Sequence, residues 1–146
     1  MYLPIQKFGL NNYQEGISLK KIIQELIKKA TKARLNSYAP YSKFTVGAAV
    51  MTDDGAIFSG CNIENVSLGL SMCAERVAIY KAITAGYRTF KVMAVICDTR
   101  EPCSPCGACR QVMVEFSPEM DVVMTNQHHK FKIKKARELL PDTFHG

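Results

Sequence analysis

Two cysteine-containing segments constrain this chain more than any other feature: CAE at residues 73–75 and PCSPCGAC at residues 102–109. The second segment carries Cys103, Cys106 and Cys109 at every third position, so either neighbouring pair forms a C-x-x-C. The first residues, MYLPIQKFGLNNYQEG, lack the basic start and apolar run of a secretory signal, which predicts a reducing, cytoplasmic location. Clustered cysteines in such a compartment indicate metal binding or catalysis before disulfides.

Length and charge limit the class of protein further. A chain of 146 residues favours one domain, and we expect an N-terminal extension over residues 1–16 and a single domain over residues 17–146. The net charge of +6 is compatible with nucleic acid, but the lysine-rich segments lack interleaved aromatic residues for base stacking. We therefore predict no nucleic-acid partner. No apolar run is long enough for a bilayer, so no membrane partner is expected either.

Hydrophobic periodicity divides the chain into alternating helices and strands. Ser18 is the expected N-cap of a helix that reaches about Leu35, with an apolar stripe formed by Leu19, Ile22, Ile23, Leu26, Ile27, Ala30 and Ala33. Strands are expected at residues 44–52, 56–63, 90–98 and 120–126, the first two joined by a DDG hairpin turn. Further helices are expected at residues 73–85, 106–116 and 133–140, ended by Gly86, Pro118 and Pro141 respectively.

This order of elements, α-β-β-α-β-α-β-α, predicts an α/β fold. A mixed central sheet with helices on both faces, a three-layer αβα sandwich, accommodates it. The segment at residues 90–98 is almost wholly apolar, so we expect it to be a strand buried on both faces.

The predicted helix starts place three cysteines in a setting that favours thiolate. Cys73 begins one helix, and Cys106 and Cys109 lie at the start of another. Unpaired N–H groups and partial positive charge at a helix N-terminus stabilise a thiolate. Zinc in catalytic sites takes three protein ligands and keeps a fourth position open, whereas structural sites use four. The three cysteines therefore indicate an open, catalytic zinc site.

The choice of ligands stays open on spacing alone. Cys103 and Cys106 also satisfy P-C-x-x-C, and Cys103 as a fourth ligand would close the site into a structural one. The helix entry SPC favours Cys106 and Cys109. The other two cysteines, Cys61 and Cys97, lie in predicted strands and are expected to be buried small hydrophobes.

Charged residues beside the cysteines suggest further roles. Glu75 follows Cys73 by two positions, which matches the C/H-x-E…P-C-x-x-C pattern of zinc deaminases, where the glutamate shuttles protons and does not bind the metal. Its alternative is an ordinary acidic residue in the first turn of a helix. Arg76 and Arg110 could donate to the sulfurs and offset the charge of three thiolates, or form surface ion pairs instead.

Several segments together resemble the small, homotetrameric cytidine deaminases: SYAPYSKFTVGAAV, GCNIENVSLGLSMCAERVAIYKAI, SPCGACRQVMVEF and ELLPDTF. The resemblance covers about residues 18–144 and makes residues 17–146 a cytidine deaminase-like catalytic domain. It implies one Zn²⁺ per subunit held by Cys73, Cys106 and Cys109, with Glu75 as the proton shuttle. It also implies substrate contacts by Phe44, Asn62, Glu64, Ala74, Ser104 and Phe144, and supporting roles for Arg76 and Gln111.

The same resemblance implies an activity and an assembly. The expected reaction is hydrolytic deamination of cytidine and 2′-deoxycytidine to the uridines with release of ammonia, in pyrimidine salvage. The expected assembly is a homotetramer with active sites shared between subunits, Phe144 reaching a neighbour's site. One position departs from the family, because Leu68 stands where a tyrosine from across the subunit interface is usual.

Other functions remain open on the sequence. The substrate could be another cytosine-bearing molecule or a polynucleotide, although the NIEN segment argues against both. From a different class, a structural zinc module with four cysteines would bind a partner and would have no use for Glu75.

Overall fold

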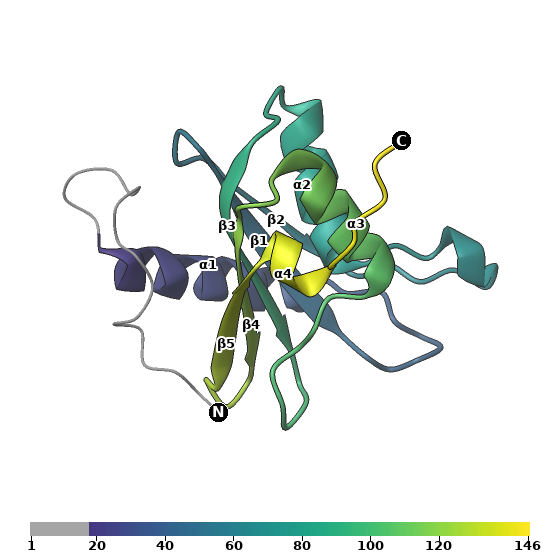
Figure 1. Ribbon diagram of the computed structural model, residues 1–146. Coiled ribbons are helices and arrows are strands. Elements are labelled where there is room, and N and C mark those ends of the chain that lie inside the picture. The colour runs from purple at the N-terminus through teal and green to yellow at the C-terminus, as the bar shows by residue number, and fades with distance from the viewer. Residues whose placement is uncertain (1–17) are drawn as a thin grey trace.

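The computed structural model describes residues 18–146, so the predicted extension at residues 1–16 lies outside the described residues. One five-stranded sheet forms the centre, in the order β2-β1-β3-β4-β5 (Figure 1). Its strands are β1 (Val46–Thr52), β2 (Ile57–Cys61), β3 (Phe90–Cys97), β4 (Asp121–Asn126) and β5 (Phe131–Lys135). Only β3 and β4 pair in parallel, so within the described chain the sheet is mixed, as predicted.

Helices cover both faces of the sheet (Figure 1). Helix α1 (Leu19–Arg34) packs on one face, and its apolar side chains share a core with β1, β3, β4 and β5. On the other face lie α2 (Ala74–Thr84), α3 (Gly107–Phe116) and α4 (Ala136–Leu139), around a second core. The predicted three-layer αβα sandwich is confirmed, and β3 is buried along almost its whole length between the two cores.

Local sequence explains how α1 sits so close to the sheet. The hydroxyl of Ser18 accepts a hydrogen bond from Lys21 N at 3.4 Å and caps the helix, as predicted. Gly47 in β1 lies directly beneath the helix, where a Cβ atom would come within 2.0 Å of the Ala30 carbonyl oxygen. No residue other than glycine permits this approach without moving the backbone.

A second glycine lets α2 rest on β2. A Cβ atom on Gly60 would lie 2.8 Å from both the Ala74 carbonyl oxygen and the Ala78 nitrogen. The first turn of α2 is therefore seated directly on the strand, which fixes the position of Cys73 at the helix N-cap. At the other end, Gly86 has φ of 102° and stops the helix where the sequence predicts.

The C-terminal prediction is wrong in one respect. The segment at residues 133–140 is not one helix, because residues 131–135 form β5 and only α4 that follows is helical. Alternation explains the strand: Ile133 is buried against the α1 core, while Lys132 and Lys134 point the opposite way. The lysines, which resemble the start of an amphipathic helix in sequence, are instead the second face of an edge strand.

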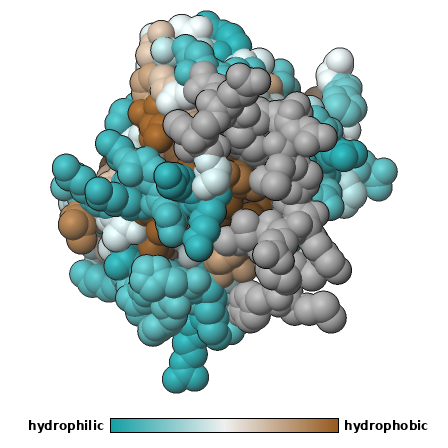
Figure 2. Space-filling model, turned by 90° about the vertical axis from the view of Figure 1, so that its left-hand side faces the viewer, coloured by the Kyte–Doolittle hydropathy of each residue, from teal (hydrophilic) through white to brown (hydrophobic). Residues whose placement is uncertain are grey.

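Lysines on α1 account for much of the positive charge. Lys20, Lys21, Lys28, Lys29 and Lys32 are all exposed, opposite the buried stripe of the helix. Figure 2 shows mainly hydrophilic side chains, with apolar ones between them, where the grey atoms leave the surface visible. This arrangement is that of a solvated helix face. None of the helices in residues 18–146 has the length and apolar character needed to cross a membrane.

Candidate zinc and active site

Two helix N-termini bring three sulfurs together. Cys73 is the N-cap of α2, Cys106 is the N-cap of α3, and Cys109 lies in the first turn of α3. The Cys106 Sγ lies 3.7 Å from the Cys73 Sγ and 3.6 Å from the Cys109 Sγ. All three sulfurs are within 4.8 Å of one another, and no other His, Cys, Asp or Glu of residues 18–146 joins the group. We call these residues the cysteine triad.

The triad has the dimensions of a zinc site. Tetrahedral ligands at the usual Zn–S distance of about 2.3 Å lie about 3.8 Å apart, close to both measured separations. Cys109 is buried, Cys73 is half-buried and Cys106 is exposed, so solvent reaches one side of the group. Three thiols with one accessible side match a catalytic zinc site, which has three protein ligands and an open fourth position.

Electrostatics around the triad favour the thiolate form of Cys73. The Cys109 side chain hydrogen-bonds Cys73, and the Arg76 guanidinium donates to Cys73 Sγ at 3.4 Å. Together they lower the pKa of Cys73 to about 5 despite its partial burial. The same interaction with Cys73 raises the pKa of Cys109. The prediction that Arg76 donates to a sulfur is confirmed, whereas its Nε is buried without a hydrogen-bond partner.

Glu75 lies beside the triad. Its side chain is only 4% exposed and hydrogen-bonds Cys109. Burial raises the pKa of the carboxyl to about 7, with a smaller contribution from the charge of Cys73. A carboxyl group with a pKa near neutrality can both accept and donate a proton, which is what a proton shuttle requires. The alternative of a solvated first-turn acid does not fit a side chain this deeply buried.

Cys103 belongs to a different pair. Its backbone N–H donates to the Thr125 carbonyl at 3.1 Å, which holds the loop against β4. Its thiol hydrogen-bonds Cys97 at the end of β3, which lowers the pKa of Cys97 to about 6 and raises that of Cys103. Cys103 and Cys97 are both buried. The fold thus separates Cys103 from the triad and leaves Cys106 and Cys109 as the C-x-x-C pair that meets Cys73.

Two expectations about residues near the triad are wrong. Arg110 does not donate to sulfur: its Nε binds the Pro105 carbonyl and its Nη1 the Leu139 carbonyl, each at 2.8 Å. Arg110 follows Cys109 in α3, so its side chain leaves the helix in another direction. It links the loop that precedes α3 to α4. Cys61 lies in β2 as predicted but is half-buried, because β2 is an edge strand.

The predicted nucleoside residues converge on one loop, residues 38–46. The Asn62 side chain donates to the Phe44 carbonyl at 2.7 Å and accepts from Val46 N at 2.8 Å. Glu64 accepts from the backbone N–H groups of Tyr41 and Ser42 at 3.0 and 3.2 Å, and from the Ser42 hydroxyl. Hydrogen bonding by Ser42 lowers the pKa of Glu64. Sequence reasoning assigned no role to Ser42, although it lies within the segment SYAPYSKFTVGAAV.

The remaining predicted residues lie around the triad helices and at the C-terminus. Ala74 is fully buried at the start of α2. The Ser104 hydroxyl donates to the Met124 sulfur at 3.7 Å, and Gln111 Nε2 donates to the Phe144 carbonyl at 3.5 Å. The Phe144 ring is 77% exposed. Leu68, in a short 3-10 helix (Leu68–Leu70), is also 77% exposed.

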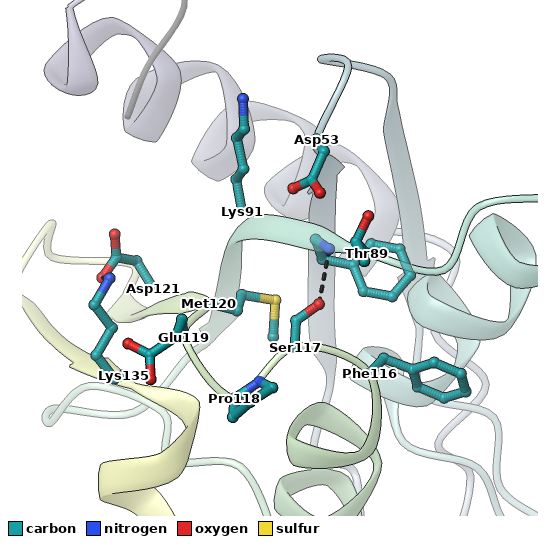
Figure 3. A pocket seen from close by; sticks show the side chains of 11 residues that line it. Asp53, Thr89, Lys91, Phe116, Ser117, Pro118, Glu119, Met120, Asp121 and Lys135 are labelled. Carbon is teal, nitrogen blue, oxygen red and sulfur yellow. Dashed lines mark hydrogen bonds and ion pairs between the residues drawn. The ribbon is translucent and has the colours of Figure 1, made fainter. Parts of the chain in front are cut away.

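A cavity of about 670 Å³ lies at the other end of the sheet, where β3 and β4 begin (Figure 3). Its lining mixes both charges, with Lys135 paired to Asp121 at 2.7 Å, and the Ser117 hydroxyl accepts from Phe90 N at 2.8 Å. None of its lining residues is a cysteine or a predicted substrate contact. The cavity is therefore separate from the triad.

Comparisons with known proteins agree with this geometry. Residues 20–125 match the model of the cytidine and deoxycytidylate deaminase zinc-binding region. A cytidine deaminase of Sporosarcina psychrophila is 48% identical over 84% of this chain and 90% of its own length. A probable cytidine deaminase of Dictyostelium discoideum is 43% identical over 83% of this chain and 85% of its own.

Solved structures give the same result. The crystal structure of cytidine deaminase from Burkholderia pseudomallei has a TM-score of 0.81 and 51% identity, covering 83% of this chain and 98% of its own. That of cytidine deaminase from Mycobacterium tuberculosis has a TM-score of 0.73 and 35% identity, covering 84% and 97%. The matched zinc-binding region contains the triad, whose geometry fits zinc. This chain belongs to the cytidine and deoxycytidylate deaminase family and has zinc as its cofactor.

Proposed function

We propose that the protein catalyses the hydrolytic deamination of cytidine and 2′-deoxycytidine to uridine and 2′-deoxyuridine, with release of ammonia. The observation that carries this proposal is the buried Glu75 carboxyl, with a pKa of about 7, beside three thiols of zinc-site dimensions. The family to which the chain belongs supports the same reaction.

Cys73, Cys106 and Cys109 would hold the zinc ion. When bound, zinc acts as a Lewis acid that lowers the pKa of a water molecule from about 15.7 toward about 7. Glu75 accepts a proton from the water that attacks C4 of the cytosine ring and delivers a proton to N3. Its carboxyl group then carries the second proton to the amino group, which leaves as ammonia. Arg76 donates to Cys73 and limits the excess negative charge of the three thiolates.

The loop of residues 38–46 and the NIEN segment would hold the nucleoside. In this proposal Asn62 and Glu64 bind the ribose 3′-hydroxyl, and Phe44 packs against the pyrimidine. The Ala74 backbone meets the base edge, and the Ser104 carbonyl lies near the departing ammonia. The lowered pKa of Glu64 keeps it ionised at neutral pH, so it would repel a 3′-phosphate. A free nucleoside therefore fits better than a polynucleotide.

Exposed apolar residues support an assembly of several copies. Val66, Leu68 and Leu70 are 78%, 77% and 70% exposed on one arm between β2 and α2, and Phe144 is 77% exposed. We propose a homotetramer in which these residues are covered by neighbouring subunits and Phe144 reaches a neighbour's site. A reducing cytoplasm suits six free thiols and a role in pyrimidine salvage.

The test measures zinc content and nucleoside turnover on one purified sample. We expect about one zinc per chain, and an absorbance change with both cytidine and 2′-deoxycytidine. Zinc-loaded protein that turns over neither nucleoside would refute the proposal and favour a structural zinc module. Sedimentation of the same sample tests the assembly, because a monomer with full activity would exclude the shared site.

A further inference from the structure

Ser42 connects two residues that the proposed function assigns to the nucleoside. Its hydroxyl donates to Glu64 Oε1, and the same oxygen accepts from Phe44 N at 3.0 Å. Lys43, between Ser42 and Phe44 in the chain, has φ of 59°, in the left-handed region that is uncommon for residues other than glycine. This turn lets one short side chain reach both neighbours. Ser42 therefore links the Glu64 carboxylate to the backbone of Phe44.

Counting acceptor sites shows what the bond does to Glu64. An ionised carboxylate has about four lone-pair sites, two on each oxygen. Two backbone N–H groups, of Tyr41 and Ser42, occupy Oε2, and the Ser42 hydroxyl occupies one site on Oε1. The one site left for a ligand is on Oε1. The direction of that free site is fixed by the hydroxyl of Ser42.

Asn62 is held by the same loop. Its side-chain oxygen accepts from Val46 N and its nitrogen donates to the Phe44 carbonyl, which leaves one N–H and one lone pair of the oxygen for a ligand. Both predicted ribose residues thus retain free hydrogen-bonding groups, and these groups are oriented by the loop of residues 38–46. For Asn62 the anchors are backbone atoms, whereas for Oε1 of Glu64 the anchor is a side chain that mutation can remove.

We propose that Ser42 is a positioning residue that determines recognition of the ribose 3′-hydroxyl by orienting the Glu64 carboxylate. The inference rests on the proposed function. Without the hydroxyl, the carboxylate keeps its two backbone donors but can turn about them, so the free site on Oε1 no longer has one direction. Binding of nucleosides that carry a 3′-hydroxyl weakens, while the distant chemistry at C4 is unaffected.

The experiment compares cytidine with 3′-deoxycytidine in wild type and in Ser42→Ala. In Ser42→Ala we expect KM for cytidine to rise about tenfold, the factor that corresponds to 1.4 kcal/mol, with kcat within about twofold because only binding changes. KM for 3′-deoxycytidine, which lacks the contact, should change less than about twofold. Ser42→Thr, which keeps the hydroxyl, should restore most of the preference for cytidine.

The matched control is Ser37→Ala. The Ser37 hydroxyl donates to the Val46 carbonyl at 3.1 Å and so anchors the same loop without a contact to Glu64. This variant should leave the ratio of KM values for the two substrates unchanged. If Ser42→Ala does not fold, Ser42→Cys replaces it, because the thiol is similar in size and a weaker donor. Ser42→Cys should also raise KM for cytidine more than KM for 3′-deoxycytidine.

Two results would overturn the inference. Equal increases of KM for both substrates would mean that Ser42 only stabilises the loop. Unchanged KM for cytidine would mean that the two backbone donors orient Glu64 without it. A wild-type protein that turns over no nucleoside would refute the proposed function, and the inference with it, whereas normal wild-type turnover with either result above would refute the inference alone.

Discussion

Five of the six cysteines lie in two groups that differ in ways spacing does not reveal. The triad of Cys73, Cys106 and Cys109 forms at two helix N-termini with one side open to solvent. The pair of Cys97 and Cys103 is buried where β3 ends and the next loop returns. Cys103 forms a C-x-x-C motif with Cys106 in sequence, yet its thiol is hydrogen-bonded to the thiol of Cys97. The fold around each sulfur, not the motif, decides which group it joins.

A lowered thiol pKa does not separate the two groups. The pKa of Cys73 falls to about 5 and that of Cys97 to about 6, each through a hydrogen bond from a neighbouring thiol. What distinguishes the triad is a third sulfur, an arginine that donates to it, and access for solvent. The partners of Cys97 are the thiol of Cys103 and the Thr99 hydroxyl. Metal binding should therefore depend on the triad and not on the pair.

The largest effect is expected from a change in the triad itself. Cys73→Ser removes one of three sulfurs and replaces a thiolate with a neutral hydroxyl, which is a poor zinc ligand. Zinc content should fall to background, and cytidine turnover should fall with it. Metal analysis and a turnover assay on the same sample check this. A Cys73→Ser protein with a full complement of zinc would show that the pair contributes to the metal site.

Glu75→Gln should separate chemistry from metal binding. The amide keeps the shape of the buried side chain but cannot take up a proton, so turnover should fall by about 10²- to 10⁴-fold. Zinc content should stay at the wild-type value, because Glu75 does not belong to the group of sulfurs. Loss of zinc in this variant would make Glu75 a ligand and enlarge the triad to four residues.

Arg76→Gln should have a smaller effect on both properties. Partners of metal ligands typically contribute about 10- to 100-fold in metal affinity or activity. Arg76 donates to Cys73 Sγ, so its loss should weaken zinc retention against a chelator by a factor in that range. Arg88 is the matched control, since its guanidinium donates to the backbone carbonyls of Ile83 and Tyr87 and not to a cysteine sulfur. Equal zinc retention by both variants would contradict the role given to Arg76.

Sequence patterns predicted the layers of this fold better than its last strand. Seven of the eight predicted elements are present because their periodicity reflects burial, as in α1 and β3. The eighth was wrong because the segment is short and rich in lysine: in β5 a single core residue, Ile133, alternates with lysines. The pairing of β5 with β4 decides its structure, and that contact between strands has no pattern within the segment itself.

The site shows the same limit. Motif spacing placed Cys73 and Glu75 beside a C-x-x-C pair, and the fold brings Cys73, Cys106 and Cys109 together with Glu75 next to them. Spacing could not choose between Cys103 and Cys109, because both form P-C-x-x-C or C-x-x-C with Cys106. It also misjudged Arg110, which adjoins Cys109 in sequence but projects toward the Pro105 and Leu139 carbonyls. Direction around a helix and the course of a loop determine these contacts, and neither follows from distance along the chain.

The smallest effect on function is expected from Cys103→Ser. The substitution removes the thiol that is hydrogen-bonded to Cys97 and puts a hydroxyl at a buried position. The free energy of unfolding should therefore fall by about 1 kcal/mol. Zinc content should be unchanged and turnover within about twofold of wild type, because the triad keeps its three sulfurs. Denaturant unfolding, metal analysis and the turnover assay measure the three quantities.

Cys97→Ser is the matched variant for this prediction, since Cys97 is the other member of the pair and is 1% exposed. The two variants should lose similar stability and retain equal zinc, because each breaks the same thiol contact. A Cys103→Ser protein that lost zinc while Cys97→Ser kept it would place Cys103 in the metal site. That result would reverse the comparison, since the C-x-x-C spacing of Cys103 with Cys106 would then outweigh its burial against β3.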